Sequence, residues 1–336
     1  MQITELVSPK LPTASVIDQA RQLVYADWQQ VDTLIQKSLH SPVELIEKIC
    51  QHIIQSGGKR LRPLLTLLSA KLCDYPGTDH IRLAVIVEFI HTATLLHDDV
   101  VDASGLRRGQ PTANSLWGNQ ASVLVGDFLY SRTFQLLTEM QHLPIMQILA
   151  NATNTIAEGE ILQLVNRNNP QVSEQNYLDV IRSKTAVLFA AATELGVAVA
   201  QHSPEQQQAM ADYGLHLGMA FQMIDDWLDY AVNAEESGKN PGDDLADGKI
   251  TLPLIYAMQH SSPAESQLIR KAIEQGTSQD FKAILEIIAS TQAFAYVRRC
   301  AQHHADKAKA ALAIFPDNHY RQSLIALAQL AVDRSN

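Results

Sequence analysis

The chain is poor in residues that interrupt helices. Its 336 residues include only 15 Gly and 13 Pro, and aromatic residues make up 6%. So low a density of turn formers favours long helices over a fold rich in strands. Alternating apolar and polar runs bounded by hairpin turns, the usual signature of strands, are also nearly absent. The sequence therefore predicts an all-α protein.

Cysteine is scarce as well. Cys50, Cys73 and Cys300 lie far apart, and none belongs to a CxxC pair. An odd, scattered set argues against a disulfide framework and against a zinc site, and it suits a reducing cytosol. We expect each of the three to be a small buried apolar residue rather than a nucleophile.

Targeting and membrane-spanning patterns are missing from the sequence. The first residues, "MQITELVSPKLPTASVIDQARQ", have no basic segment leading into an apolar core, so no secretory signal is predicted. No run reaches the roughly 18 uninterrupted apolar residues of a membrane span, and the best candidate is interrupted by Glu88 and His91. We expect a soluble, cytoplasmic protein with no transmembrane segment.

Positive charge is in deficit. There are 26 Lys and Arg against 36 Asp and Glu, which gives a formal net charge of −10. Nucleic acid is therefore not an expected partner, because phosphate backbones select basic faces. An anionic substrate remains compatible with this balance if cations gather locally, or if metal ions reverse the local charge.

What the sequence does contain is helical periodicity, with apolar residues three and four positions apart almost throughout. It predicts helices over residues 14–39, 42–56, 61–74, 79–103, 119–140, 144–166, 173–183, 185–201, 204–232, 250–261, 264–275, 278–290, 292–314 and 317–333. Residues 79–103 and 204–232 are apolar on most sides, so we expect them to be the central pair. No segment between helices is long enough to be a domain linker. We predict one all-α domain over residues 1–336.

Both of these apolar helices end in the pattern DDxxD, formed by Asp98, Asp99 and Asp102 and by Asp225, Asp226 and Asp229. The first and last aspartate of each motif are four residues apart and lie on one helix face. Carboxylates placed this way repel each other, and apolar surroundings make their charge costly. A divalent cation between them would remove both problems, and an all-oxygen ligand set favours Mg²⁺ over zinc.

The motifs have two simpler interpretations that do not require catalysis. A single DDxxD is usually a solvated helix end, although two copies that each close an apolar run are harder to explain in that way. A structural metal clip between two helices is the intermediate possibility.

Basic and polar residues near the acidic helices suggest anion sites. The candidates come from "GGKRLRP", "GLRRGQPT", "RSKTAV" and "GKNPGDDLADGK", and they are Lys59, Arg62, Arg107, Arg108, Lys184, Thr185, Lys239 and Lys249. His91 and Gln222 lie on the same helix faces as the aspartates. For Arg60 and Asp247 an ordinary solvated charge is the better interpretation. Two groups of cations suggest two anionic substrates. One would be bound through bridging metal ions, and the other directly by Lys, Arg and His side chains.

The chemistry that fits is ionisation of a diphosphate ester. No nucleophile elbow, Walker A loop or GxGxxG fingerprint is present. Magnesium would stabilise the charge on a departing diphosphate, and apolar walls would keep water from the carbocation.

In these motifs the chain resembles the trans-polyprenyl diphosphate synthases over nearly its whole length. Six segments match in order: "GGKRLRP", "EFIHTATLLHDDVVD", "RRGQPTAN", "LVGDFLYSR", "AFQMIDDWLDY" and "GKNPGDDLADGKITLP". The resemblance implies a helical barrel around a deep cavity, usually a homodimer. It implies addition of isopentenyl diphosphate to an allylic diphosphate such as farnesyl diphosphate.

The resemblance also implies roles for individual residues. The aspartates of both motifs would bind two to three Mg²⁺ ions, with Asp98, Asp102, Asp225, Asp229 and Lys184 in catalytic roles. Isopentenyl diphosphate would be held by Lys59, Arg62, His91 and Arg108. The allylic diphosphate would be held by Arg107, Lys184, Thr185, Gln222, Lys239 and Lys249. We expect residues 236–249 to close over the site.

Product length depends on the residues beneath the first motif. Thr94 and Ala93 lie four and five residues before Asp98, roughly 6–8 Å deeper along the helix. Both are small, where short-chain members of the family often have aromatic residues. This predicts a long product. The resemblance implies eight or nine isoprene units, of the kind that supplies quinone side chains. Phe134 is a candidate for a deeper stop, although core packing is the favoured role for that residue.

Four alternative functions remain compatible with parts of the pattern: a shorter-chain synthase, a class I terpene cyclase, a non-catalytic subunit of a heteromeric synthase and a helical scaffold with a structural metal. A cyclase would not need a second diphosphate site. A non-catalytic subunit should have lost one acidic cluster, whereas both are present here.

Overall fold

The structure, a computed structural model, describes residues 13–231 and 242–334, and helices make up most of both ranges. In chain order the helices are α1 (Thr13–Leu23), α2 (Tyr25–Ser38), α3 (Glu44–Gln55), α4 (Leu61–Leu72), α5 (Asp79–Val101), α6 (Ala113–Trp117), α7 (Asn119–Met140), α8 (Leu143–Asn166), α9 (Glu174–Ile181), α10 (Val187–Val199), α11 (Pro204–Ala231), α13 (Asp243–Ala246), α14 (Leu252–His260), α15 (Pro263–Gln275), α16 (Phe281–Ser290), α17 (Ala293–Ala311) and α18 (His319–Asp333). Within these ranges the strands are β1 (Leu106–Arg107) and β2 (Gln110–Pro111), which form a small antiparallel hairpin. The all-α fold class is confirmed.

The main differences between the predicted and the observed helices are at three places. The helix predicted over residues 14–39 is two helices, because Val24 leaves helical geometry (φ −121°, ψ 26°) and buries its side chain. The helix predicted over residues 292–314 ends in a 3₁₀ turn, Leu312–Ile314. The predicted gap near residue 184 is instead a π-helical turn, Arg182–Ala186, which joins α9 to α10 without a break.

The centre of the bundle is also different from the prediction. α5 and α11 are largely buried, but the helix that lies between them is α10, which packs against α11, α4, α5 and α8. α5 and α11 therefore flank α10 instead of forming a packed pair.

Two glycines explain how α10 approaches its neighbours so closely. A Cβ at Gly196 would lie 2.6 Å from the Cβ of Ser69 on α4. A Cβ at Gly214 of α11 would lie 2.8 Å from the Cα of Ala190 on α10. Real Cβ atoms do not come so close to other atoms, so only glycine allows these backbones to pack at this distance.

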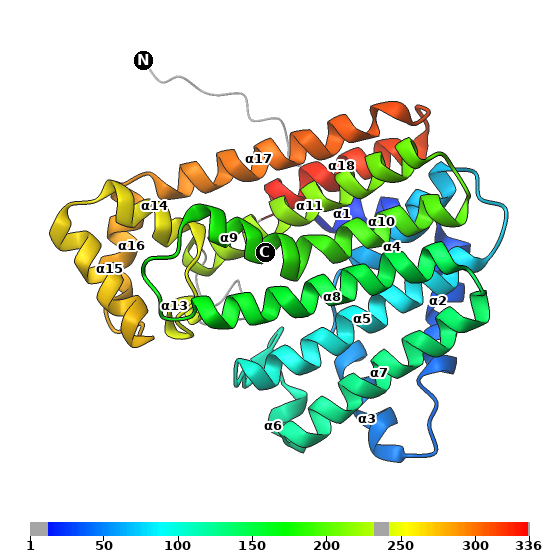
Figure 1. Cartoon of the computed structure of the whole chain (residues 1–336), viewed down its shortest axis with the longest axis horizontal. Coiled ribbons are helices and arrows are strands. Elements are labelled where there is room, and N and C mark those ends of the chain that lie inside the picture. Colours follow the sequence, from blue (N-terminus) through cyan, green and yellow to red (C-terminus); the bar gives the residue numbers. More distant parts are fainter. Residues whose placement is uncertain (1–12, 232–241, 335–336) are drawn as a thin grey trace.

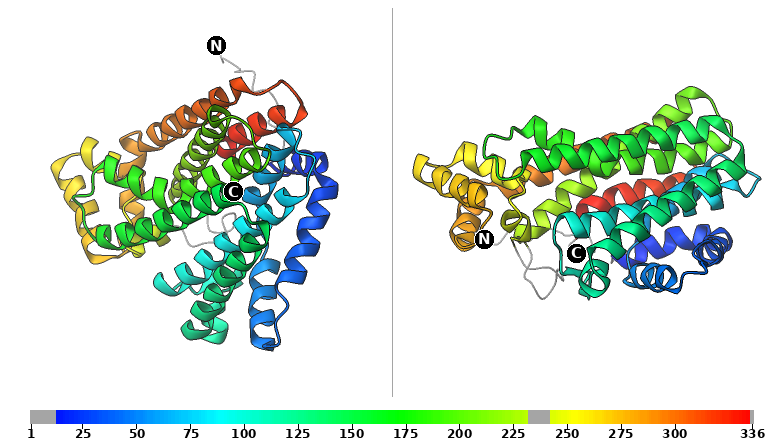
Figure 2. Two further views of the ribbon diagram at one scale, coloured as in Figure 1. Left: turned by 45° about the vertical axis from the view of Figure 1, so that its right-hand side comes forward. Right: turned by 60° about the horizontal axis from the view of Figure 1, so that its bottom comes forward.

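The long helices run alongside one another, with α14, α15 and α16 grouped at one end (Figure 1). The two rotated views show the same arrangement, with α1 to α3 along one side of the molecule (Figure 2). The buried side chains form one continuous cluster from Ile17 to Val332. The single domain over residues 1–336 stays a prediction. Within the described ranges, no helix has both the length and the apolar composition needed to cross a lipid bilayer.

Candidate active site

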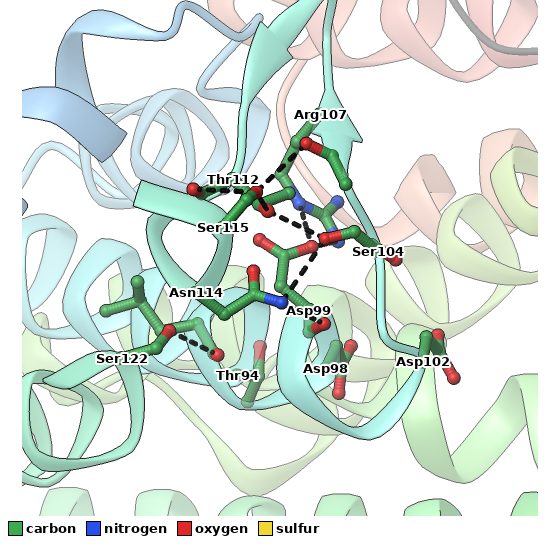
Figure 3. Close-up of polar contacts among 12 residues, drawn as sticks. Thr94, Asp98, Asp99, Asp102, Ser104, Arg107, Thr112, Asn114, Ser115 and Ser122 are labelled. Atoms are coloured by element: carbon green, nitrogen blue, oxygen red, sulfur yellow. Dashed lines mark hydrogen bonds and ion pairs between the residues drawn. The ribbon is translucent and has the colours of Figure 1, made fainter. Parts of the chain in front are cut away.

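The first acidic motif lies at the end of α5, where its aspartates point in two directions. Thr94, Asp98 and Asp102 follow one another along one side of the helix (Figure 3). Lys184 Nζ lies 3.5 Å from Asp98 Oδ2, and Lys249 Nζ donates to Asp102 Oδ2 at 2.9 Å. Asp98 and Asp102 thus face the cations that the sequence assigns to the allylic diphosphate.

Asp99 points to the other side of α5, toward the hairpin (Figure 3). Its side chain is buried, and Arg107 donates to Oδ1 from Nε at 2.9 Å and from a terminal nitrogen at 2.6 Å. Asn114 Nδ2 donates to the Asp99 carbonyl at 3.1 Å. In this structure Asp99 and Arg107 fix the hairpin to α5, so their predicted roles in metal and substrate binding stay predictions.

The second motif, on α11, divides in the same way. Asp225 Oδ1 lies 3.4 Å from Arg334, and Asp229 Oδ2 accepts the backbone N–H of Asp244 at 3.3 Å. Asp226 is buried and accepts from the Tyr177 hydroxyl at 2.7 Å and from Gln222 Nε2 at 2.8 Å. In both motifs, therefore, the second aspartate is held by the scaffold while the first and last are at the site.

Lys249 connects the two motifs. Besides its bond to Asp102, its Nζ lies 3.0 Å from Asp247 Oδ2 and 4.0 Å from Asp244 Oδ1. Asp244 in turn donates its backbone N–H to Asp229. Burial alone would lower the pKa of Lys249, but the carboxylates of Asp244, Asp102 and Asp247 raise it above its usual value. The two acidic clusters thus belong to one continuous network.

Lys184 is presented by the π-helical turn. Its Nζ donates to Glu160 Oε2 of α8 at 2.6 Å. Burial and the charge of Asp98 raise the pKa of Glu160 to about 7, although Lys184 opposes the shift. Gly159 allows the contact, because a Cβ there would lie 2.8 Å from the backbone nitrogen of Lys184. π-Helical turns are often found at functional sites.

Thr185 and Gln222, both predicted to hold the allylic diphosphate, are brought together. Thr185 Oγ1 donates to Gln222 Oε1 at 3.0 Å, and Gln222 donates onward to Asp226. Lys239, predicted for the same substrate, lies outside the described residues. So do residues 236–241 of the segment expected to close over the site.

Of the residues predicted to bind isopentenyl diphosphate, Arg62, His91 and Arg108 lie near one another, whereas the charged groups near Lys59 are Arg334 and Asp225. The Arg62 guanidinium lies 4.2 Å from the centre of the Phe189 ring, and burial lowers the pKa of Arg62 to about 10. Burial, with the charges of Arg62, Arg108 and Arg107, holds the pKa of His91 well below its usual value. The carboxylate of Glu88 offsets part of this positive charge, and an anion bound among the cations would offset more of it.

Two further observations support an anion site there. Arg62 Nε is buried and has no hydrogen-bond partner among the described residues. Burial, with the charge of Arg334, lowers the pKa of Lys59. Arg108 donates to the Gly57 carbonyl, which ties the hairpin to the "GGKRLRP" segment. By contrast, Arg60 forms an ion pair with Asp32 at 2.7 Å.

Sequence reasoning missed four residues of this site: Glu160, Arg167, Tyr177 and Arg334. Arg334 directly follows α18, and its guanidinium lies 3.8 Å from the centre of the Phe221 ring. Arg167 directly follows α8 and reaches Asp102 at 3.2 Å. Both partners are more than sixty positions away in sequence, so no local pattern could identify them.

The carboxylates of the two motifs suit Mg²⁺. They offer oxygen only, as Mg²⁺ prefers. Burial raises the pKa of Asp98 although Lys184 opposes the shift, so a further cation beside this carboxylate would stabilise its charged form. Within the described ranges, no three potential ligands converge on one point. A metal would therefore need oxygens from a substrate to complete its coordination, which is common for Mg²⁺.

The predicted chain-length residues lie at different depths. Ala93 is fully buried, and Thr94 Oγ1 donates to the His91 carbonyl at 2.8 Å. Phe134 of α7 is 57% exposed and lies at the edge of a groove of about 470 Å³ between α5, α7 and α8. Its predicted role as a deep stop remains a prediction, and the structure puts its side chain on the surface.

Comparison with known proteins agrees with this geometry. The model of the polyprenyl synthetase family matches residues 43–288. The octaprenyl diphosphate synthase of Escherichia coli K12 is 47% identical over 319 residues, which are 95% of this chain and 99% of that protein. A polyprenyl synthase from Caulobacter crescentus CB15, solved in complex with calcium and isoprenyl diphosphate, is 46% identical, with a TM-score of 0.92 over 95% of this chain and 98% of that one. A decaprenyl diphosphate synthase from Rhodobacter capsulatus is also 46% identical, with a TM-score of 0.91 over 95% of this chain and 99% of that one.

The fold, the two acidic motifs and these relatives together define a prenyltransferase. The chain belongs to the polyprenyl synthetase family. The resemblance that the six sequence segments indicated is thereby confirmed.

The buried Asp226 gives a testable pH dependence. Burial and the charge of Asp244 raise its pKa to about 8, although Tyr177 and Gln222 oppose the shift. A raised carboxyl pKa stabilises the fold in the protonated form, so this contribution is complete at acid pH and is lost as pH rises through about 8. The melting temperature of metal-free protein should therefore fall from about pH 5 to about pH 8 and level off above. Asp226→Asn should flatten this fall in scanning calorimetry with EDTA.

The matched control is Glu274→Gln, on the exposed surface of α15, which should keep the wild-type slope. An Asp226→Asn variant with an unchanged slope would contradict this assignment.

Proposed function

We propose that the chain is a long-chain trans-polyprenyl diphosphate synthase. It adds isopentenyl diphosphate units to an allylic diphosphate such as farnesyl diphosphate and releases octaprenyl diphosphate, the precursor of a quinone side chain. The observation that carries this proposal is the network from Asp102 through Lys249 and Asp244 to Asp229, which joins the acidic clusters of two separate helices.

The two substrates bind to different sets of cations in this proposal. The allylic diphosphate lies near Lys184 and Lys249, whose ammonium groups are already beside Asp98 and Asp102. Isopentenyl diphosphate lies among Lys59, Arg62, His91 and Arg108. The buried, unpartnered Arg62 Nε is a donor ready for that anion.

Magnesium is the expected cofactor. Asp98 and Asp102 on one side, and Asp225 and Asp229 on the other, would hold two to three ions. Bound there, the metal would stabilise negative charge as the diphosphate leaves. Glu160 holds Lys184 in place by a hydrogen bond, so that its ammonium stays directed at the leaving group. Neutral His91 would donate a hydrogen bond without adding charge to an already cationic pocket.

The groove between α5, α7 and α8 is the proposed path of the growing hydrocarbon. Ile90 of α5, Thr133 and Leu137 of α7 and Leu149 of α8 line it. Tyr130 also lines the groove, and burial together with the charges of Asp98 and Glu160 raises the pKa of Tyr130 to about 12. Tyr130 thus belongs to the groove wall and is also near the charged residues of the site, and the groove supplies room for a long hydrocarbon.

A homodimer is proposed on the basis of one apolar surface. We call it the α7–α8 face; its exposed side chains are Val123, Leu124, Phe134, Leu143, Ile161, Leu164 and Val165. Leu124 is 66% exposed and Val165 70% exposed. A cluster of this kind usually marks a protein–protein interface. The cytoplasmic location expected from the sequence stays a prediction.

The function is tested by incubating pure protein with Mg²⁺, farnesyl diphosphate and labelled isopentenyl diphosphate. The mass of the dephosphorylated product should correspond to eight isoprene units. No incorporation of label would contradict the proposed function. Incorporation that stops after one or two additions would leave a prenyltransferase but contradict the long product.

Ala93→Tyr tests the proposed path of the hydrocarbon beneath Asp98. Ala93 is fully buried one turn above Ile90, so a tyrosine there should obstruct the hydrocarbon and shorten the product by several isoprene units. Thin-layer analysis of dephosphorylated lipids measures the change. An unchanged length would show that the hydrocarbon does not pass this position.

Thr133→Phe tests the groove itself. Thr133 is buried in the groove wall, so the larger ring should narrow it and shorten the product. The same substitution at Thr138, on an exposed part of α7, is the matched control and should leave product length unchanged. Equal product lengths for the two variants would exclude the groove as the path.

Leu124→Glu tests the dimer. A buried, unpaired carboxylate at an interface is strongly unfavourable, so sedimentation equilibrium should show this variant as a monomer and the wild type as a dimer. Ile314→Glu, at an exposed site outside the α7–α8 face, should remain dimeric. A Leu124→Glu dimer as tight as that of the wild type would exclude this face.

A further inference from the structure

The corner that ends α8 touches the short loop that carries Lys249. The corner consists of Arg167 and Asn168, and the loop of Asp247, Gly248 and Lys249. Arg167 Nε donates to the Asp247 carbonyl at 2.7 Å, and the Asn168 N–H donates to the Gly248 carbonyl at 3.0 Å. Two consecutive residues of the corner therefore hold two consecutive carbonyls of the loop.

Gly248 makes the contact possible. It has a left-handed backbone (φ +68°), and a Cβ at this position would overlap the side-chain amide of Asn168. The loop cannot move nearer to the corner or slide past it without breaking these contacts. The position of Lys249 is thus set by the end of α8.

Arg167 also reaches the first acidic motif. A terminal nitrogen of its guanidinium lies 3.2 Å from Asp102 Oδ1, while Lys249 Nζ lies 2.9 Å from Asp102 Oδ2. Each oxygen of this carboxylate is thereby held by a different cation. One guanidinium fixes both the carboxylate and the loop that supplies its second partner.

The electrostatic surroundings favour an arginine at this position. Arg167 directly follows α8, where the partial negative charge of the helix end attracts a cation. Its side chain is 23% exposed, so the ion pair is partly shielded from water. Burial would raise the pKa of Asp102, but Lys249, Lys184 and Arg167 lower it, so the carboxylate stays ionised.

We propose that Arg167 is a positioning residue for the allylic diphosphate, because it fixes Asp102 and the Lys249 loop relative to each other. This inference rests on the proposed function, since it assigns Asp102 and Lys249 to the same substrate. In the proposed function, isopentenyl diphosphate is held by a different set of residues, Lys59, Arg62, His91 and Arg108. Loss of Arg167 should therefore raise KM for the allylic diphosphate more than KM for isopentenyl diphosphate. A general loss of stability would not produce this difference.

The experiment compares Arg167→Gln, Arg167→Lys and a matched control, Arg270→Gln. Arg270 donates to the Pro170 carbonyl at 3.2 Å, so it supports the same turn of the chain through a backbone carbonyl rather than through a site carboxylate. Steady-state KM values are measured for farnesyl diphosphate and for isopentenyl diphosphate. KM does not depend on the fraction of active protein, so partial misfolding does not obscure the comparison. The melting temperature is recorded for each variant.

Arg167→Gln should raise KM for farnesyl diphosphate by about tenfold or more, as expected for loss of charge-assisted hydrogen bonds. KM for isopentenyl diphosphate should change by less than about twofold. Arg167→Lys should raise KM for farnesyl diphosphate less than Arg167→Gln does, because a lysine can still reach one of the two acceptors. Arg270→Gln should resemble the wild type in both KM values.

A second readout does not require turnover. Calorimetric titration of the protein with inorganic pyrophosphate in the presence of Mg²⁺ should show binding weakened about tenfold in Arg167→Gln but not in Arg270→Gln. If Arg167→Gln matches the control in this titration and in both KM values, the proposal is wrong while the synthase function stands. If the wild type has no turnover but Arg167→Gln still weakens pyrophosphate binding, the proposed function fails while the positioning role is retained. An equal rise in both KM values would show a general structural role and overturn the proposal.

Discussion

The structure depends on neutralising carboxylates at the ends of two apolar helices. Asp98 and Asp102 close one helix and Asp225 and Asp229 close the other, in surroundings where unopposed charge is costly. The protein meets this cost with cations from distant parts of the chain. Lys249 is the central one, because it contacts the first cluster directly and the second through neighbouring backbone and carboxylates. This arrangement also suits the site to a metal-bound diphosphate.

The fold connects the two clusters through Lys249 and Asp244. α10 lies between α5 and α11, and glycine contacts bring its backbone close to α4 and α11. The π-helical turn before α10 directs Lys184 toward Asp98, and Gly159 of α8 leaves space for it. In each motif the middle aspartate is bound by the scaffold, Asp99 by Arg107 and Asp226 by Tyr177. The scaffold thus orients each motif through one aspartate and leaves two for the site.

Much of this site could be predicted because its signals are local. The spacing of each DDxxD motif identifies the helix face on which its first and last aspartates lie, and the structure places Asp98 and Asp102 together on that face. The different orientation of Asp99 could not be predicted, since it depends on a hairpin partner. Arg167 and Arg334 carry no local signal at all, because tertiary packing alone brings them to the motifs. The break at Val24 was missed for a similar reason: helical periodicity continues across it, and burial decides the bend.

The most direct test of this account is a crystal structure with Mn²⁺ and a non-hydrolysable farnesyl thiodiphosphate, with the metals located by anomalous scattering. Manganese prefers oxygen ligands as magnesium does. The account predicts metal peaks lying between the carboxylates of Asp98 and Asp102 and those of Asp225 and Asp229, with the diphosphate joining them. Metal bound to one cluster alone, or a diphosphate bound away from both, would contradict it.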